Sequence, residues 1–284
     1  MVSLLTILSY SAFSQARPDS TGQADQKSSL QIGTQFLSNN VFMGRTGRKA
    51  VPIISPDFKY MFASGLYFAG DMDIVPGLKK DRINGGSLTA GYDFDLTRNL
   101  EGGISYSKMF YNANSTLVGA SMTNIFNFNL DYNIDHIITP SVSVDYSLNN
   151  RGVANDIFLN AGLSHDFISH NVFDKKDALI ISPTVSVNWG TQNFYEAYIE
   201  RKTNQTERQL ALMNTFESRL NQFQLLDYEI SVPFDYKIKH FIAHFTPTYA
   251  IVQNGFKSGA VARAVGLSNN SSVLYFEMGV GLKF

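Results

Sequence analysis

The sequence contains no cysteine, which excludes disulfide frameworks, thiolate metal sites and a lipid-modified cysteine anchor. After the first 15 residues it has no apolar run of about 18 residues, so a helical membrane protein is also excluded. Neither charge sign is in excess: the net charge is −1, which gives no reason to expect a nucleic-acid partner. The mean hydropathy of −0.09 is that of an ordinary soluble chain, so any membrane signal must lie in the pattern of residues.

The chain does contain strict alternation of apolar and polar residues, shown best by the segment from Phe126 to Asn133. Segments of this kind recur at roughly ten residues each, the length at which a tilted strand crosses a bilayer. The sequence therefore predicts an all-β fold, an antiparallel transmembrane β-barrel. The twelve expected strands are 29–38, 53–62, 66–75, 84–96, 100–111, 123–134, 138–148, 156–167, 179–189, 224–235, 239–252 and 272–284.

The connections between these strands predict the sidedness of the barrel. An even strand number places both termini in the periplasm, where connections are short. The expected periplasmic turns are 63–65, 97–99, 135–137, 168–178 and 236–238. The expected external loops are longer on average: 39–52, 76–83, 112–122, 149–155, 190–223 and 253–270.

The N-terminus has the pattern of a secretory signal. An apolar stretch from Val2 to Tyr10 precedes Ala12-Phe13-Ser14, a small-x-small cleavage pattern, although no Lys or Arg precedes the stretch. We expect a signal peptide at 1–14, truncated if the true start lies upstream, then a periplasmic leader at 15–28 and the barrel at 29–284. A buried N-terminal strand is the alternative for the apolar stretch.

The last expected strand carries apolar residues at every second position and ends on Phe284. A final strand that ends in Phe resembles the assembly signal of bacterial outer-membrane barrels. Val280, Leu282 and Phe284 are therefore the candidate assembly signal, and the barrel-assembly machinery is an expected partner.

Fixing the apolar face of each strand also fixes the opposite face, which in a barrel points inward. The candidate lumen-lining residues are Asp57, Lys59, Asp71, Asp73, Asn127, Asn129, Asp131, Asp145, Asn160, Asp227, Glu229 and Glu277. Acidic residues outnumber basic ones in this set, and a lumen lined by one sign of charge attracts counter-ions. The alternative is that these carboxylates form hydrogen bonds across a packed, closed interior.

Prolines and loops raise further expectations. Pro56, Pro140, Pro183, Pro233 and Pro247 lie inside expected strands, where a residue without an N–H group indicates a bulge or bend. In the long loop 190–223, apolar residues recur at nearly helical spacing, which favours an amphipathic helix that enters the lumen or caps the mouth. An extended hairpin is the alternative.

Most basic residues fall in the expected external loops. They include Arg45, Arg48, Lys49, Lys79, Lys80 and Arg82. These side chains either pair with phosphates of lipopolysaccharide or are solvated. Outer-membrane lipid and lipopolysaccharide are thus expected partners.

The first 110 residues resemble a known family. The segments SNNVFMGR at 38–45, PIISP at 52–56 and SGLYFAG at 64–70 are similar to the start of the TorF-type porins, and AGYDF at 90–94 and GGISY at 102–106 look like the next hairpin. This resemblance implies a barrel of the bacterial outer membrane and a porin-like role, but no particular solute.

Together these patterns favour an outer-membrane porin or channel for small polar or cationic solutes. A closed structural or adhesive barrel, whose external loops bind lipopolysaccharide or a partner, is the alternative. An outer-membrane enzyme is the less favoured hypothesis, since the five histidines lie mostly near periplasmic turns and not at the outer rim. We therefore expect no catalytic residues, no metal and no cofactor.

Overall fold

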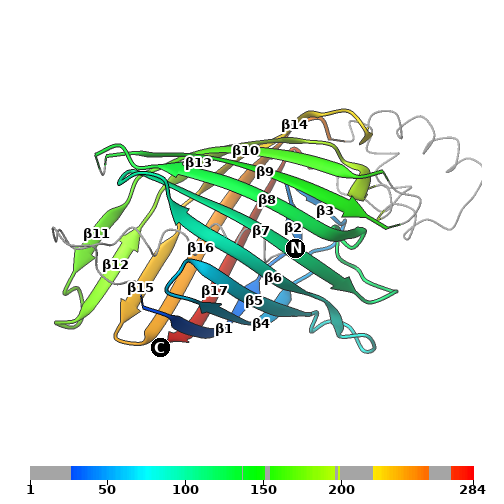
Figure 1. Cartoon of the computed structure of the whole chain (residues 1–284). Coiled ribbons are helices and arrows are strands. Elements are labelled where there is room, and N and C mark those ends of the chain that lie inside the picture. The colour runs from blue at the N-terminus through cyan, green and yellow to red at the C-terminus, as the bar shows by residue number, and fades with distance from the viewer. Residues whose placement is uncertain (1–26, 136, 151–153, 196–197, 199–219, 256–269) are drawn as a thin grey trace, which may run out of the picture.

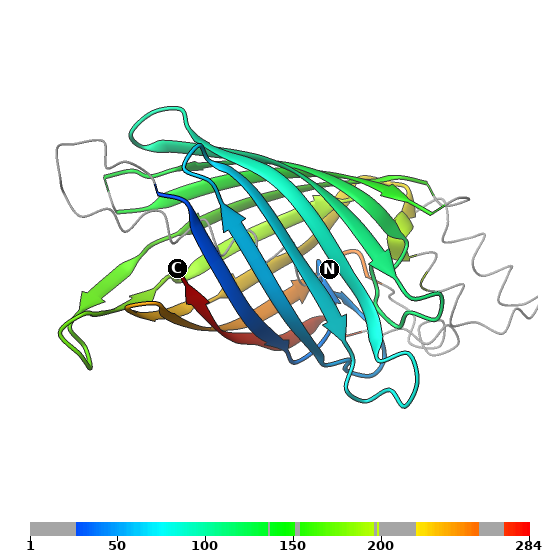
Figure 2. The same ribbon diagram turned by 60° about the horizontal axis from the view of Figure 1, so that its bottom comes forward.

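The computed structural model describes residues 27–135, 137–150, 154–195, 198, 220–255 and 270–284. They form a closed antiparallel β-barrel of twelve strands, which confirms the predicted fold class and strand number (Figures 1 and 2). The expected signal peptide and nearly all of the expected leader lie outside the described residues. The segments that build the barrel are β1 (Ser29–Leu37), β4 (Ile53–Met61), β5 (Leu66–Ile74), β6 (Ile83–Asp95), β7 (Leu100–Tyr111), β8 (Met122–Tyr132), β9 (Thr139–Asn149), β10 (Asp156–Ser164), β11 (Phe167–His170), β12 (Asp177–Ile181), β13 (Thr184–Gly190), β14 (Gln224–Ser231), β15 (Phe234–Ile238), β16 (Phe241–Val252) and β17 (Ser272–Lys283).

Three of the twelve barrel strands are interrupted. β10 continues into β11, β12 into β13 and β14 into β15, each after a break of two residues. Pro183 and Pro233 lie in two of these breaks, so the expected bends occur there. The carbonyl of Pro183 accepts from the His165 amide and that of Pro233 from the Ser182 amide, which keeps the neighbouring strands joined across the bend.

The other three prolines do not behave as expected. Pro56, Pro140 and Pro247 lie inside β4, β9 and β16, and the described ladders of these strands continue past them without a register shift. A proline keeps its carbonyl as an acceptor, as at Pro247, which accepts from the amide of Val232 at 3.2 Å. No bulge therefore occurs at these three positions, and a local bend there remains a prediction.

One periplasmic connection also differs from the expectation. The segment 168–178 was expected to be a periplasmic turn, but only 171–176 form the turn, while the residues on either side belong to the paired strands β11 and β12. The carboxylate of Asp177 accepts from the amides of Val172, Phe173 and Asp174 at 2.7 to 2.9 Å and from the hydroxyl of Tyr236 at 3.0 Å. These bonds order the tip of the hairpin, so both strands extend beyond the neighbouring turns.

The barrel closes where β17 pairs with β1 in an unbroken register from Gln31 opposite Lys283 to Leu37 opposite Glu277. The terminal residue extends this seam, because Phe284 and Leu30 exchange both backbone hydrogen bonds, at 2.8 and 3.0 Å. The Phe284 ring is exposed and stacks on His240, with ring centroids 5.4 Å apart. Lys283 lies on the opposite face of the strand.

The outward face of the barrel is apolar over most strands. Large apolar side chains that are exposed there include Ile32, Phe58, Phe68, Leu88, Ile104, Phe126, Phe128, Val144, Tyr228, Ile230, Met278 and Val280. No helix in the described part of the chain is long and apolar enough to cross a membrane.

Because Phe284 completes the seam, we expect its removal to impair folding of the barrel. Deleting Phe284, or replacing it with Asp, should strongly reduce the fraction of heat-modifiable protein on unheated gels. Lys283→Asp changes a side chain on the other face and is the control. Equal effects of the two substitutions would show that the register assigned to the last strand is wrong.

Candidate functional site in the barrel interior

All twelve candidate lumen residues lie on the strand face opposite the exposed apolar side chains. They come from seven strands that surround the interior: β4, β5, β8, β9, β10, β14 and β17. In β8, for example, Phe126 and Phe128 are exposed outward, whereas Asn127 and Asn129 face inward. Their role in conducting a solute remains a prediction.

Inward side chains change in character along two of the strands, β14 and β17. In β14, buried Leu226 is followed by Asp227 and Glu229, and in β17, buried Val273 and Tyr275 are followed by Glu277. The interior is thus apolar at the end that carries the long loops, here called the loop end. It is acidic in the middle and polar toward the opposite, turn end.

The middle of the interior holds a belt of buried carboxylates, defined as Asp73, Asp145, Asp227, Glu229 and Glu277. All five are at most 8 % exposed. Four of them accept a hydrogen bond from a neutral side chain. Ser55 donates to Asp73 at 2.8 Å, Asn127 to Asp145 at 2.7 Å, Asn188 to Asp227 at 2.7 Å and Tyr275 to Glu229 at 3.2 Å. Hydrogen bonds from neutral donors stabilise a buried carboxylate without cancelling its charge.

The fifth member of the belt faces a histidine. Nε2 of His244 lies 3.3 Å from Oε1 of Glu277, and both side chains are largely buried. Gly279 makes this arrangement possible, because a Cβ atom at that position would lie 2.3 Å from Cε1 of His244. The sequence did not indicate this pair, although the register of β16 and β17 places the two residues on adjacent strands.

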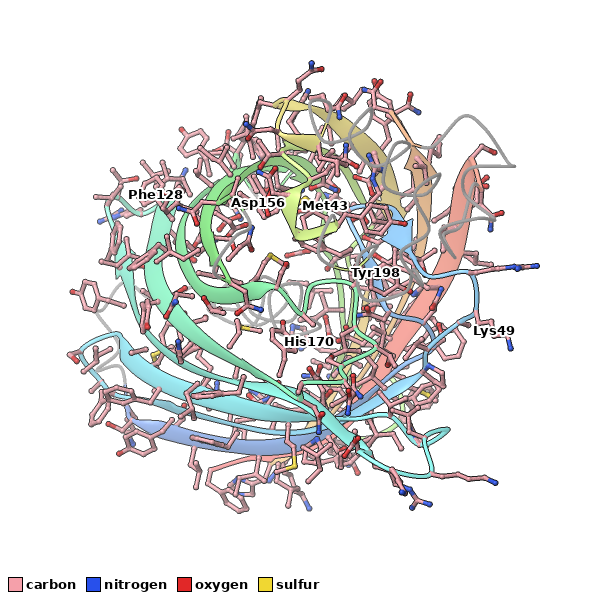
Figure 3. The ribbon with its side chains drawn as sticks, turned by 90° about the vertical axis from the view of Figure 1, so that its right-hand side faces the viewer. Met43, Lys49, Phe128, Asp156, His170 and Tyr198 are labelled. Atoms are coloured by element: carbon pink, nitrogen blue, oxygen red, sulfur yellow. The ribbon has the colours of Figure 1, made fainter. Side chains whose placement is uncertain are left out.

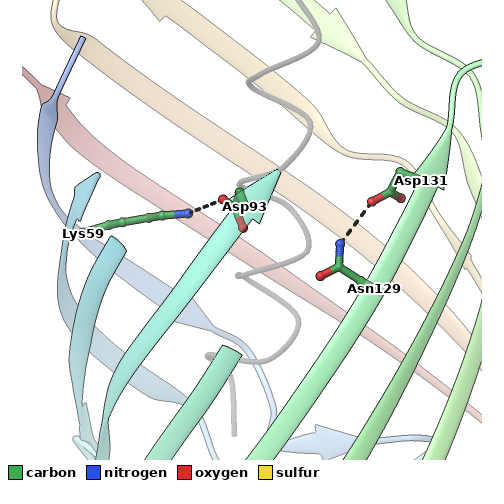
Figure 4. Close-up of polar contacts among 4 residues, drawn as sticks. All are labelled: Lys59, Asp93, Asn129 and Asp131. Carbon is green, nitrogen blue, oxygen red and sulfur yellow. Dashed lines mark hydrogen bonds and ion pairs between the residues drawn. The ribbon is translucent and has the colours of Figure 1, made fainter. Parts of the chain in front are cut away.

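Toward the turn end the inward side chains are more accessible to water. Nζ of Lys59 lies 3.8 Å from the Asp93 carboxylate and 4.1 Å from the centre of the Tyr67 ring. Figure 4 shows this pair on one side of the interior and the hydrogen bond from Asn129 to Asp131, 3.4 Å long, on the other. Asp93 is about half exposed, with 46 % of its side chain accessible.

Two apolar clusters, which together we call the plug, lie at the loop end of the described residues. One contains Phe42, Val118, Phe194, Tyr195 and Tyr198 from the loops, packed on Met109, Met122, Ile125, Phe158 and Leu226. The other contains Val41, Leu117 and Ala120 from the loops, packed on Leu37, Ile53, Ala250, Val273 and Tyr275. Several of these side chains, such as Leu117, Met122 and Phe194, are completely inaccessible to water.

Three loops meet in the plug: 38–52, 112–121 and the described start of 190–223. Phe42 lies edge-on to Phe158 and Phe194, with ring centroids 5.1 and 4.9 Å apart. The amide of Val118 donates to Oδ1 of Asn40 at 2.7 Å, and the hydroxyl of Ser121 donates to the carbonyl of Phe194 at 3.2 Å. Each loop therefore contacts the other two.

Arg45 lies at the centre of these contacts. From the short strand β3 (Arg45–Thr46), which pairs with β2 (Val41–Phe42), its guanidinium donates to Oε1 of Gln192 at 2.6 Å and to the carbonyls of Leu226 and Gln253 at 3.0 and 2.9 Å. Burial lowers the pKa of Arg45, while the nearby Tyr195 and Asp227 raise it, and a guanidinium stays charged in proteins. Arg45 thus joins the first loop to β14, to the residue that follows β16 and to the long loop.

Asp156 holds the described part of the long loop. Its carboxylate accepts from the amides of Asn193 and Phe194, both at 2.8 Å, and from the side chains of Thr191 and Asn149. A carboxylate that binds the amides at the start of a helical turn caps it. Figure 3, which looks in from the loop end, shows Asp156, Met43 and Tyr198 within the ring of strands.

The plug corrects one expectation about the external loops. Arg45 was grouped with the loop bases that pair with lipid phosphates or are solvated, but it is buried at 3 % exposure. The helix expected in the loop 190–223 lies outside the described residues except for Leu220, so it remains a prediction. Of the described residues of this loop, 190–195, 198 and 220 are buried and 221–223 are exposed. Sequence reasoning missed Phe42, Leu117, Val118 and Phe194 as interior residues, although apolar pairs in otherwise polar loops were a visible signal.

The chain matches no family model and no curated protein, so the TorF resemblance remains a prediction. Among solved structures, it is similar to the KdgM porin, with a TM-score of 0.48 at 8% identity over 90% of this chain and 99% of that one. A COG4313 outer membrane channel from Pseudomonas putida F1 gives 0.47 at 10% identity over 95% and 100%. An enzyme, LpxR from Salmonella typhimurium, gives 0.43 at 10% identity over 89% and 99%. At these scores the likenesses carry no argument about activity.

We expect Arg45→Met to loosen the plug, because it keeps the aliphatic stem but removes every donor. Loss of one charge-assisted hydrogen bond corresponds to about a tenfold change or more in the opening equilibrium. Amide hydrogen exchange at Thr46 and Val118 should accelerate by about that factor. Arg48→Met, at an exposed position of the same loop, is the control, and unchanged exchange in the Arg45 variant would contradict the assigned role.

Proposed function

We propose that the protein is an outer-membrane channel for small polar or cationic solutes whose loop end is closed by the plug. The observation that carries the proposal is the acidic belt, in which carboxylates outnumber the cations that face them. A field of one sign in a low-dielectric enclosure raises the local concentration of cations. If the interior served only to stabilise the fold, apolar side chains or paired charges in place of these carboxylates would make the protein more stable.

The apolar outward face supports a membrane location. A soluble barrel with Phe58, Phe126, Phe128 and Ile230 exposed to water would present an apolar surface far larger than monomeric proteins tolerate. In a bilayer these side chains contact hydrocarbon and not water, so their exposure is no longer unfavourable. The closed ladder also leaves no strand edge in the lipid. We therefore place the protein in the bacterial outer membrane, with the turn end toward the periplasm.

In this proposal the plug is a gate. We infer that cations enter from the turn end, where the Asp93 side chain is 46 % exposed, and that release of the three loops would extend the path outward. Arg45 is the side chain whose loss should favour the open state, because it binds three separate segments at once.

A closed structural barrel is the second candidate, and the plug itself favours it. Residues such as Leu117, Ile53 and Phe194 are as completely buried as any protein core. In that case the carboxylates serve the folded state only, and the exposed loops carry the function.

Conductance measurements distinguish the two candidates. We expect the Arg45→Met variant to pass more current than the parent protein in planar bilayers, with reversal potentials that favour cations and a preference that weakens in high salt. Adding Glu229→Gln and Glu277→Gln to that variant should reduce the preference, whereas adding Asp174→Asn, at the exposed hairpin tip, should not. Anion selectivity would contradict the proposed role of the belt, and absence of current in every variant would favour the closed barrel.

The membrane location has a test that does not depend on conduction. Phe128→Arg places a cation on the outward face of β8, and near the bilayer midplane this should lower the free energy of unfolding by about 2–4 kcal/mol. Asn129→Arg, on the inward face, should be mild. Urea unfolding of the refolded protein in lipid vesicles measures both, and an equal effect would contradict burial of this face in hydrocarbon.

A further inference from the structure

Five cationic side chains gather at the loop end above β4, β5 and β6. Arg48 and Lys49 precede β4, while Lys79, Lys80 and Arg82 lie in the connection from β5 to β6. The three strands are neighbours, since Ile74 pairs with Ile54 on one side and with Ile83 on the other. Val51 and Leu78 pack on the same apolar cluster, which brings the two loops together. We call these five residues the basic patch.

All five side chains are exposed, unlike Arg45 in the same loop. Within the described residues no ion pair joins any of them to a carboxylate. Asp81 is the single acidic residue of the two loops, and its Oδ2 accepts from Asn114 at 3.4 Å. Nε of Arg82 donates to the carbonyl of Leu78 at 2.9 Å, which ties that guanidinium to its loop. Figure 3 shows Lys49 pointing away from the ring of strands.

The wall directly below the patch is apolar and exposed. Ile54, Met72, Ile83 and Leu88 point outward from β4, β5 and β6, and Ile83, at 57 % exposure, follows Arg82 in the chain. Cations above apolar side chains match a molecule with anionic groups above hydrocarbon. A free anion or a soluble polyanion would bind the cations but would make no use of the apolar wall.

We propose that the basic patch binds the phosphate groups of a phosphorylated glycolipid of the outer leaflet, whose acyl chains lie on the wall below. Arg binds phosphate oxygens through paired N–H donors, and Lys adds mobile point charge. The site rests on the proposed outer-membrane location, but it does not require that the barrel conducts.

The test uses full-length refolded protein in mixed detergent micelles that contain bisphosphorylated lipid A. The variant replaces Arg48, Lys49, Lys79, Lys80 and Arg82 with Gln. It should bind this lipid at least about tenfold more weakly, the factor for loss of one charge-assisted hydrogen bond. The control replaces Lys175, Lys176 and Lys237 with Gln near the turn end and should bind like the parent protein. Dephosphorylated lipid A should bind weakly to all three proteins.

The outcomes distinguish a lipid phosphate from free phosphate, and they distinguish failure of the lipid site from failure of the proposed channel. Unchanged affinity of the patch variant, or equal binding of dephosphorylated lipid A, would overturn the phosphate site. Competition by inorganic phosphate as effective as that by lipid A would assign the patch to a free anion and overturn the glycolipid. If the quintuple variant does not refold, Lys49→Glu and Lys80→Glu, made singly, take its place. Patch-dependent lipid binding by a protein without conductance would overturn the channel alone.

Discussion

Closure of the strand ladder is the constraint on which the rest of this structure depends. A chain in hydrocarbon must satisfy every backbone N–H and C=O group internally, and a sheet achieves this only by pairing its first strand with its last. The seam between β1 and β17 does so, and the terminal residue Phe284 is part of it. Once the ladder is closed, each strand has one face toward the interior and one away from it, so the alternation in the sequence becomes a partition between two environments.

This constraint explains how much of the structure the sequence predicted. Twelve strands and the inward position of residues such as Asp145 and Glu277 follow from a period of two, which is a local property. The bends at Pro183 and Pro233 follow from the missing N–H group of proline. Pro56, Pro140 and Pro247 were misjudged because a proline can stay in a ladder when only its carbonyl is needed.

The plug was not predicted because it depends on contacts between distant segments. Asn40, Val118 and Phe194 meet only after the barrel has closed, and no periodicity in a loop indicates which way it turns. Arg45 illustrates the difficulty: its sequence neighbours include Arg48 and Lys49, which are exposed, and only the acceptors on β14 and directly after β16 distinguish it. A buried loop residue and an exposed one look alike in the sequence, and only the hydrogen-bond acceptors in the folded structure distinguish them.

The position of the acidic belt beneath the apolar plug is energetically unfavourable. Carboxylates beneath an apolar layer lose hydration, and neutral donors such as Asn127, Asn188 and Tyr275 replace only part of it. Proteins retain such unfavourable groups mainly where they serve a function. This cost fits the role that we propose for the belt, in which solute cations supply additional positive charge.

The hydrogen bonds that link the three loops have a kinetic consequence. Since the side chain of Asn40 holds Val118, that of Ser121 holds Phe194, and that of Tyr195 holds the backbone of Thr46, no loop can leave its place without breaking contacts of the other two. Units coupled in this way unfold as one cooperative element. In the gate that we propose, we therefore expect the three loops to leave their places together and not one after another.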